Sequence, residues 1–476
     1  MSSTPQSRSL SRRSVLAGAA GLGATALLAT QAPRAEAMSA ATAGRTQFVA
    51  AEVSARDVEI LRTYQSLSAS DLHPTGYYLP PNVELTVTVA ANSAAEGASI
   101  VVGAPDAEVD VEKRASRTYP ITGRRVTIAD PYGGPVYWKV LGSKGYLKAT
   151  LGPTAQPMPF FIYGQTTEDE FQNQLDRRET PYVQLVSAHA MLSIQREAAL
   201  RWRGENHAQL METWEEIVRI EDNVAGLDDK TPTHARLTHR YHFVTRAESI
   251  ANVGAFATHG HMLFPAPIQD RLLTVEALRL RGWGPYHELG HQHQQTVYKP
   301  TDLTEVTVNL YSLAVNAAFA KYGQAPRLHV PENDGVPVWE SAPPKIGTPD
   351  VDFLTTFTVM EKLVMFEQLR LAFGDQFQPA VHKLVREEQP DSGDYSDNDY
   401  RLGMLALYYS KAAGRDLRTF FARWGLRYDP SFDDRIAALA LPEPEVDPTT
   451  LRDDDGAALA AQVLASPRLR RANGLV

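Results

Sequence analysis

One pentapeptide constrains the fold of this 476-residue chain more than any other stretch: His287-Glu288-Leu289-Gly290-His291. It follows the pattern H-E-x-x-H, which works only on a helix, where residues four apart lie one above the other. His287 and His291 can then present two imidazoles to one zinc ion. Glu288 lies beside them, where a carboxylate can act as general base. The pentapeptide therefore predicts a helix that carries two zinc ligands and a catalytic base.

A second helix is predicted directly after the first. Lys299-Pro300 ends the first helix, and the stretch Thr301-Asp302-Leu303-Thr304-Glu305 offers a capping residue followed three places later by a glutamate. Two helices joined by a short connection tend to be antiparallel neighbours. This arrangement would bring Glu305 to the zinc as a third ligand and leave the fourth position open. An equally weighted alternative is that Glu305 is a helix N-terminal carboxylate that faces water.

Two further polar residues lie close to the motif. Asn309 comes one turn after Glu305, so it can accept a hydrogen bond from the free N–H of a ligating histidine. Taken alone, Asn309 is more consistent with a surface or packing residue. His293 is two positions beyond His291 and therefore points to another face of the helix. We predict that His293 is not a ligand.

These stretches resemble a known family. Residues 282–294, followed by 304–309, are similar to the enhancin-like, mucin-degrading metallopeptidases, whose motif is H-E-x-G-H with a downstream glutamate. The resemblance implies one catalytic zinc on His287, His291 and Glu305, with Glu288 as the catalytic base. Shorter stretches match the same family and extend the resemblance over most of the chain: residues 76–81, 160–164 and 420–425.

Composition excludes several other kinds of site. The chain has no cysteine, which leaves histidines and carboxylates as the ligands for any metal. The net charge of −9 gives no general attraction to nucleic acid or to anionic membranes. The length is enough for two or three hydrophobic cores. The sequence carries no signal of an oligomeric state.

The first 37 residues have the pattern of an export signal. Arg12-Arg13 precedes a short apolar, Ala/Gly-rich stretch, and Ala35-Glu36-Ala37 is a small-x-small cleavage site. This order predicts secretion by the twin-arginine pathway. The alternatives are an ordinary Sec signal or a membrane anchor, although the apolar stretch is short and weakly hydrophobic for a span. We expect no membrane span in the mature protein.

The mature chain is predicted to be an α+β multidomain protein. Residues 38–68 form a lead-in segment with a short helix. Residues 69–165 contain short alternating strands separated by Gly, Pro and Asp turns, which indicates a β-sandwich. Residues 166–325 are predicted to form a zincin-like catalytic domain. Residues 326–476 form a helical C-terminal subdomain with a peripheral tail.

Substrate contacts are predicted around the metal-binding helix. Residues 260–265 are the candidate edge strand, which would pair with the substrate backbone by β-augmentation. Trp283 can stack on a sugar ring or, alternatively, brace the helix. His261 is a second candidate for substrate contact. His261, Tyr298 and Tyr400 are possible donors to the oxyanion of the transition state.

The sequence thus predicts a secreted zinc metallopeptidase. The resemblance implies O-glycosylated, mucin-like protein or peptide as substrate, with possible contact to the glycan. Two alternatives stay open. One is a hydrolase or amidase that acts on cell-wall peptide. The other is a secreted glycan-binding protein whose zincin domain is degenerate, although the intact Glu288 argues against loss of activity.

Overall fold

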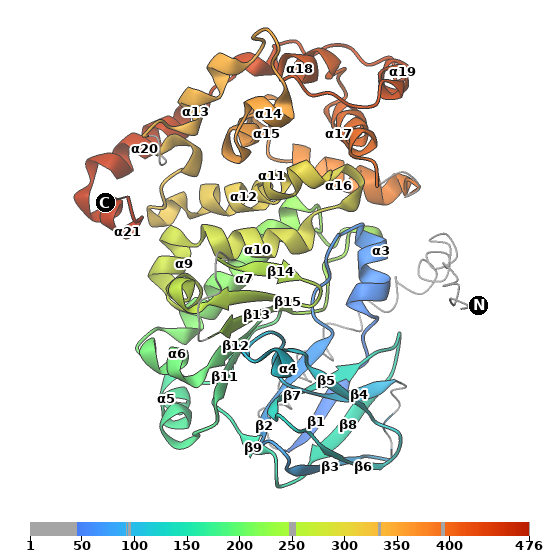
Figure 1. Cartoon of the computed structure of the whole chain (residues 1–476), viewed down its shortest axis with the longest axis vertical. Helices are drawn as coiled ribbons and strands as arrows, with labels where there is room; N and C mark the ends of the chain where they lie inside the picture. The colour runs from blue at the N-terminus through green and yellow to red at the C-terminus, as the bar shows by residue number, and fades with distance from the viewer. Residues whose placement is uncertain are drawn as a thin grey trace.

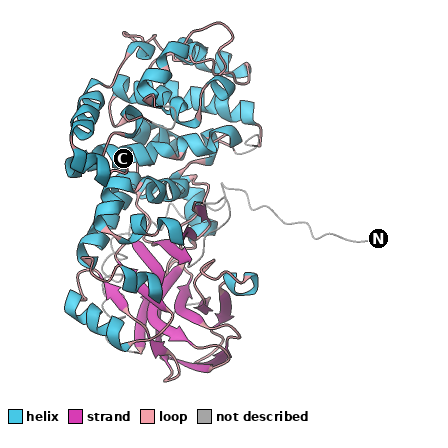
Figure 2. Cartoon of the chain, turned by 60° about the vertical axis from the view of Figure 1, so that its left-hand side comes forward, coloured by secondary structure: helices cyan, strands magenta, loops and turns pink. Residues whose placement is uncertain are grey.

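The structure combines a strand-rich N-terminal part with a helical C-terminal part (Figure 1). It is a computed structural model that describes residues 45–91, 93, 97–246, 254–331, 335–391 and 396–475. The predicted export signal, residues 1–37, lies outside the described residues. The strands lie in the lower half of the molecule with some helices beside them, and the upper half is helical (Figure 2). The predicted α+β fold class is confirmed.

Two antiparallel sheets form the N-terminal β-sandwich. The order is β1-β8-β3-β6 in one sheet and β5-β4-β7-β2-β9 in the other. Inward-facing side chains such as Leu85, Val87 and Trp138 fill the core between the sheets. The strands are β1 Thr46–Ala50, β2 Leu72–Leu79, β3 Glu84–Val89, β4 Ala98–Val102, β5 Arg117–Pro120, β6 Arg125–Ala129, β7 Gly134–Val140, β8 Tyr146–Leu151 and β9 Gln156–Pro157.

The sandwich begins earlier in the chain than the sequence suggests. Strand β1 lies inside the predicted lead-in segment, yet it pairs along its length with β8. The buried Trp138 of β7 donates its indole N–H to Gln47 of β1 at 2.7 Å, which ties the two sheets together. The short helix expected in the lead-in is present as a π-helical turn, Ala55–Glu59, followed by α3 Ile60–Thr63.

A third, six-stranded sheet supports the metal-binding helix. Its order is β10-β11-β12-β13-β15-β14, with both parallel and antiparallel pairs. Helix α7 packs on it, with the ring of Trp214 4.1 Å from that of Phe243 in β13. The strands are β10 Phe160–Ile162, β11 Tyr182–Val186, β12 Ala190–Gln195, β13 Tyr241–Arg246, β14 Phe256–Thr258 and β15 His261–Pro265. Strand β10 was expected in the sandwich but belongs to this sheet, where it pairs with β11.

The prediction that residues 260–265 form the edge strand is wrong. Strand β15 is an interior strand, flanked by β13 and β14. The edge is β14, a strand of three residues that turns back into β15 at Gly260, where φ is +86°. So short a strand gives almost no alternation of polar and apolar residues, which is why sequence periodicity does not reveal it.

The helices lie in two groups. The first packs around the third sheet: α5 Glu168–Arg177, α6 Arg196–Arg201, α7 His207–Val224, α8 Asp270–Leu273, α9 Val275–Arg281, α10 Trp283–His293, α11 Thr304–Thr307 and α12 Asn309–Phe319. The second forms the predicted helical C-terminal part: α13 Val338–Ser341, α14 Phe353–Thr356, α15 Val359–Phe373, α16 Phe377–Glu388, α17 Asn398–Ala413, α18 Arg418–Arg423, α19 Ser431–Ala437, α20 Asp454–Ala465 and α21 Pro467–Ala472. The sandwich also carries α4 Val111–Arg114. None of the helices described here has the length and apolar character that crossing a membrane requires.

Candidate metal centre

Helix α10 carries the pentapeptide, as predicted, and it packs closely against α12. A Cβ atom added to Gly290 would lie only 2.8 Å from the carbonyl oxygen of Val308 and 3.2 Å from the ring of Tyr311. A glycine at this position therefore lets the two helices approach closely. The helix starts at Trp283.

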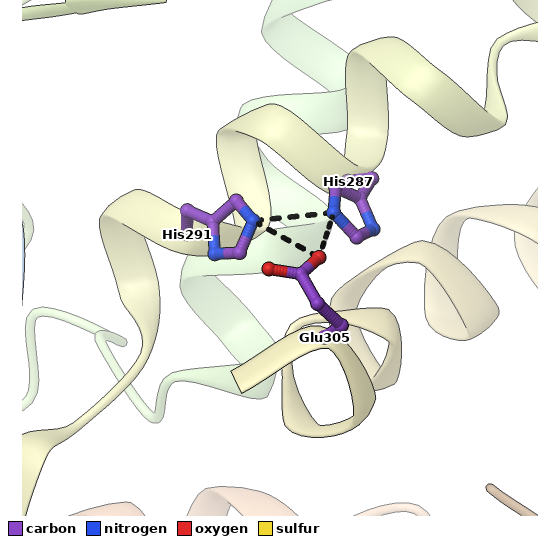
Figure 3. Close-up of side chains that lie close together, drawn as sticks. All are labelled: His287, His291 and Glu305. Atoms are coloured by element: carbon purple, nitrogen blue, oxygen red, sulfur yellow. Dashed lines mark hydrogen bonds and ion pairs between the residues drawn. The ribbon is translucent and has the colours of Figure 1, made fainter. Parts of the chain in front are cut away.

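Glu305 lies in α11, the short helix that begins the second helical segment. The predicted capping interaction at its N-terminus is absent, because α11 has no side-chain cap hydrogen bond. The Glu305 carboxylate turns instead toward the histidines of α10, although 60% of its side chain is exposed (Figure 3). The geometry therefore favours the ligand interpretation of Glu305 over a carboxylate that only faces water.

The three predicted ligands converge on one point. The Oε2 atom of Glu305 is 3.0 Å from Nε2 of His287 and 3.8 Å from Nε2 of His291. The two Nε2 atoms are 3.1 Å from each other (Figure 3). One ligand atom from each residue lies within 4.8 Å of the other two, and no second group of this kind occurs in the described part of the chain.

Two side-chain amides determine which nitrogen of each histidine carries the proton. Asn309 donates its amide N–H to the backbone carbonyl of Glu305 at 2.8 Å, so its oxygen must face His287. That oxygen accepts a hydrogen bond from His287 Nδ1 at 2.9 Å. Gln294 donates to Thr304 and Thr307, and its oxygen accepts from His291 Nδ1 at 2.8 Å. Both Nδ1 atoms are therefore donors.

This proton arrangement makes the cluster suited to a cation. A neutral imidazole with a proton on Nδ1 has a lone pair on Nε2. Two such lone pairs 3.1 Å apart, next to a carboxylate, repel one another unless a positive charge, either a proton or a metal ion, lies between them. Two neutral imidazoles and one carboxylate form a donor set typical of catalytic zinc, in which a carboxyl or amide partner fixes each histidine. The residues present thus fit a zinc ion.

The same electrostatics separates the behaviour of the two histidines. Burial lowers the pKa of His287, but the hydrogen bond to Glu305 and the charge of Glu288 outweigh it, so this pKa is raised. Burial, together with the neighbouring His287, lowers the pKa of His291 to about 4. The hydrogen bond with His287 lowers the pKa of Glu305. The cluster thus favours a charged Glu305 and a neutral His291, the forms in which both bind metal.

Glu288 lies on the buried side of α10. Only 7% of the residue is exposed, and burial raises the pKa of its carboxyl to about 7. Its neighbours His287 and Glu305 act on that pKa in opposite directions. A carboxyl that gains and loses a proton near neutral pH is suited to general acid–base work.

His293 has a different environment, as its position on the helix predicts. It is fully buried and contacts Asp222 at 3.1 Å and Glu221 at 3.4 Å, both from α7. Tyr241 of β13 lies 3.0 Å from its Nε2 atom. These partners connect α10 to the core, and none of them is His287, His291 or Glu305.

The predicted substrate contacts are not brought together at the metal centre. The guanidinium of Arg327 lies over the Trp283 ring at 5.6 Å, so one face of that ring is already covered. His261 is buried and contacts Asp106 of the β-sandwich at 2.8 Å. Tyr298, a predicted oxyanion donor, is buried, and its hydroxyl accepts from Gln378. No described contact joins Trp283, His261 or Tyr298 to His287, His291 or Glu305.

Gln294 is the partner that sequence reasoning missed. It is the first residue after α10 and has extended backbone angles, so it does not follow the helical spacing used to locate Asn309. The sequence offered one indication of this role: Gln294 comes only three residues after His291. Its role depends on contacts with Thr304 and Thr307 across the connection.

Comparison with known proteins adds independent information. The family model described as peptidase M60, enhancin and enhancin-like, matches residues 154–425, and the N-terminal domain of M60-like peptidases matches residues 52–150. The TRPM8 channel-associated factor homolog of Xenopus laevis is 23% identical over 78% of this chain. The chain spans only 40% of that relative's length.

Solved structures share the fold. A conserved protein of unknown function from Bacillus anthracis (a mutant form) superposes with a TM-score of 0.77 and 27% identity, covering 87% of this chain and 82% of that one. The M60 catalytic domain of Clostridium perfringens ZmpC, in complex with the sialyl T antigen, gives a TM-score of 0.70 and 18% identity, with 85% and 82% covered. At that identity the second likeness concerns the fold alone.

Proposed function

Because this chain belongs to the peptidase M60 family of enhancin and enhancin-like proteins, we propose that it is a secreted zinc metallopeptidase that cleaves O-glycosylated, mucin-like proteins. The observation that carries the proposal is the pair of facing Nε2 atoms, 3.1 Å apart, whose Nδ1 protons are held by Asn309 and Gln294. The two Nε2 lone pairs repel each other when no positive charge lies between them, and both would stabilise a bound cation.

The residues of the chain have separate roles in this proposal. His287, His291 and Glu305 hold the zinc, and Asn309 and Gln294 orient the two imidazoles. Bound zinc would polarise the scissile carbonyl and make a water molecule more acidic. Glu288 takes the proton of the attacking water on its carboxylate and later gives it to the leaving amine.

The edge strand offers a place for the substrate backbone. Strand β14 is directly beside the metal-binding helix, because Gln292 of α10 donates to the carbonyl of Thr258 at 2.9 Å. An extended peptide that adds to this edge would run alongside α10. Among the strands that the structure describes, β14 lies at the edge of the sheet, and β14, not β15, is therefore the proposed docking strand.

The choice of a glycosylated substrate rests on the relatives. The ZmpC catalytic domain, which has the same fold, was solved in complex with the sialyl T antigen. For this chain, contacts to a sugar would supply binding energy that positions the scissile bond. Export through the twin-arginine signal would place the enzyme outside the cell, where mucin-like substrates occur.

A binding function without peptidase activity is the second candidate. It is favoured by the name of the TRPM8 channel-associated factor homolog, which describes association with a channel. Glu288 and the three ligand candidates are all present in this chain, which favours the enzyme.

One assay separates these candidates. The mature protein is incubated with glycosylated mucin, the same mucin after deglycosylation, and cell-wall peptide, with and without a chelator. We expect cleavage of the glycosylated mucin that stops with chelator and returns with added zinc. Cleavage of cell-wall peptide alone would indicate the amidase. Binding to glycosylated mucin without any cleavage would indicate the non-enzymatic candidate.

A further inference from the structure

Lys299 occupies the connection between the two helices that carry the ligand candidates. It lies eight residues after His291 and six before Glu305. Its ammonium donates a hydrogen bond to the Ser66 hydroxyl at 3.2 Å. Both side chains are half-buried. The cation is therefore held at a fixed place by a neutral partner.

Ser66 connects Lys299 to the end of the metal-binding helix. The Ser66 amide donates to the carbonyl of Gln294 at 2.8 Å, and the side chain of Gln294 holds His291. Two residues further on, Ser68 accepts from the amide of Gly260 in the turn between β14 and β15. The segment 66–68 thus joins the end of α10 to the turn of the proposed docking strand, and Lys299 lies against this segment.

A second cation adjoins the first. Arg401 of α17 donates from its guanidinium to the backbone carbonyl of Lys299 at 2.8 Å. Its Nε atom is buried and has no hydrogen-bond partner in the described residues. Within the ranges that the structure describes, neither Lys299 nor Arg401 forms an ion pair with a carboxylate, whereas most buried cations have such a partner.

The electrostatics of this pair is unfavourable without an anion. Burial lowers the pKa of Lys299, and the charge of Arg401 lowers it further, while Glu305 acts in the opposite direction. Burial also lowers the pKa of Arg401. Two partly desolvated cations on residues that are in contact would be stabilised by a carboxylate.

We propose that Lys299 and Arg401 form a subsite that binds a carboxylate of the substrate close to the scissile bond. This inference rests on the proposed peptidase function and names a feature of its substrate. The carboxylate belongs either to an acidic amino acid or to an acidic sugar of the glycan. Both sources present the same planar, two-oxygen group. The two cations would therefore bind a carboxylate from either source.

Four glycopeptides of one sequence test the subsite and distinguish the sources. The residue next to the scissile bond is Glu or Gln, and the O-glycan either carries or lacks an acidic sugar. The subsite binds the carboxylate either of the Glu residue or of the acidic sugar. For that one of the two, we expect kcat/KM of the wild-type zinc enzyme to be about tenfold higher with the carboxylate than without it. In Lys299→Met this preference should fall to about one, because the acidic glycopeptides lose the contact to the ammonium.

Matched variants separate the subsite from general charge effects. Lys299→Arg keeps a cation and should keep most of the preference. Lys230→Met removes a cation that is 78% exposed and pairs with Asp228, so it should change nothing. Zinc content and the thermal midpoint of Lys299→Met should match those of the wild type, which shows that the metal centre is intact.

A binding measurement keeps this inference separate from the proposed activity. In the zinc-loaded Glu288→Gln protein, calorimetry should show tighter binding of the acidic glycopeptide, and Lys299→Met should abolish the difference. An unchanged preference in Lys299→Met would overturn the subsite, and so would an equal loss for acidic and neutral glycopeptides. Binding that discriminates without any turnover in the wild type would leave the subsite standing and overturn the peptidase.

Discussion

The two faces of α10 place histidines two residues apart in opposite chemical environments. His291 donates a hydrogen bond from Nδ1 to the side-chain oxygen of Gln294, and burial together with His287 lowers its pKa to about 4. His293 contacts Glu221 and Asp222; burial lowers its pKa, but these carboxylates outweigh burial and raise it to about 9. Burial and the neighbouring His287 favour the neutral, metal-binding form of His291, whereas two buried carboxylates make His293 a cation within the core. The environment of each histidine, and not the residue type, decides its role.

The largest expected effect is on the chemistry of the metal-facing side. Glu288→Gln keeps the shape of the side chain but cannot take a proton, so activity should fall by about 10²- to 10⁴-fold. Zinc content and fold should be unchanged, because Glu288 is not among the three converging ligand candidates. Turnover of the variant and the wild type is compared on glycosylated mucin with zinc measured in the same samples. Near-normal turnover would assign the base to another residue.

The core-facing side should respond through stability. His293→Gln leaves Glu221 and Asp222 buried without their cation, so the free energy of unfolding should fall by about 3–5 kcal/mol. His189→Gln is the matched control, because His189 pairs with Glu215 at 2.8 Å but is 34% exposed. Its loss should stay below about 1 kcal/mol. Urea unfolding of both variants tests this difference. Equal losses in the free energy of unfolding would mean that the buried network contributes no more than an exposed ion pair.

A smaller effect is expected from the residue that orients His287. Asn309→Ala removes the acceptor for His287 Nδ1, so zinc affinity should fall by about 10- to 100-fold. Asn309→Asp keeps an acceptor at that position and should retain more of the affinity. Zinc competition with a chromophoric chelator gives both values. An unchanged affinity in Asn309→Ala would show that the metal-facing side does not depend on its amide partners.

The sequence predicted the parts of this comparison that depend on local spacing. Helix geometry alone predicts that His287 and His291, four residues apart, lie on one face. It also predicts that His293, two residues further on, lies on another. Predicting that Glu305 approaches the two histidines required an assumption about how two helices pack. The structure shows that Gly290 lets these helices pack closely. Gln294 could not be predicted, because its role depends on non-helical backbone at the end of α10.

The errors in the fold have a similar cause. Strand β14 was missed because three residues carry no periodic signal, and β1 was missed because its pairing partner, β8, lies about 100 residues later. Arg327 lies over one face of the Trp283 ring, a contact that the sequence does not reveal. Each of these depends on contacts between distant parts of the chain, which spacing within a segment does not report.

The central claim is that the metal-facing side of α10, together with Glu305, holds zinc. The most direct test is the zinc content of the purified mature protein and of the His287→Ala/His291→Ala double variant, measured by elemental analysis. We predict about one zinc per chain in the wild type and almost none in the double variant. Full zinc content in the double variant would contradict the claim.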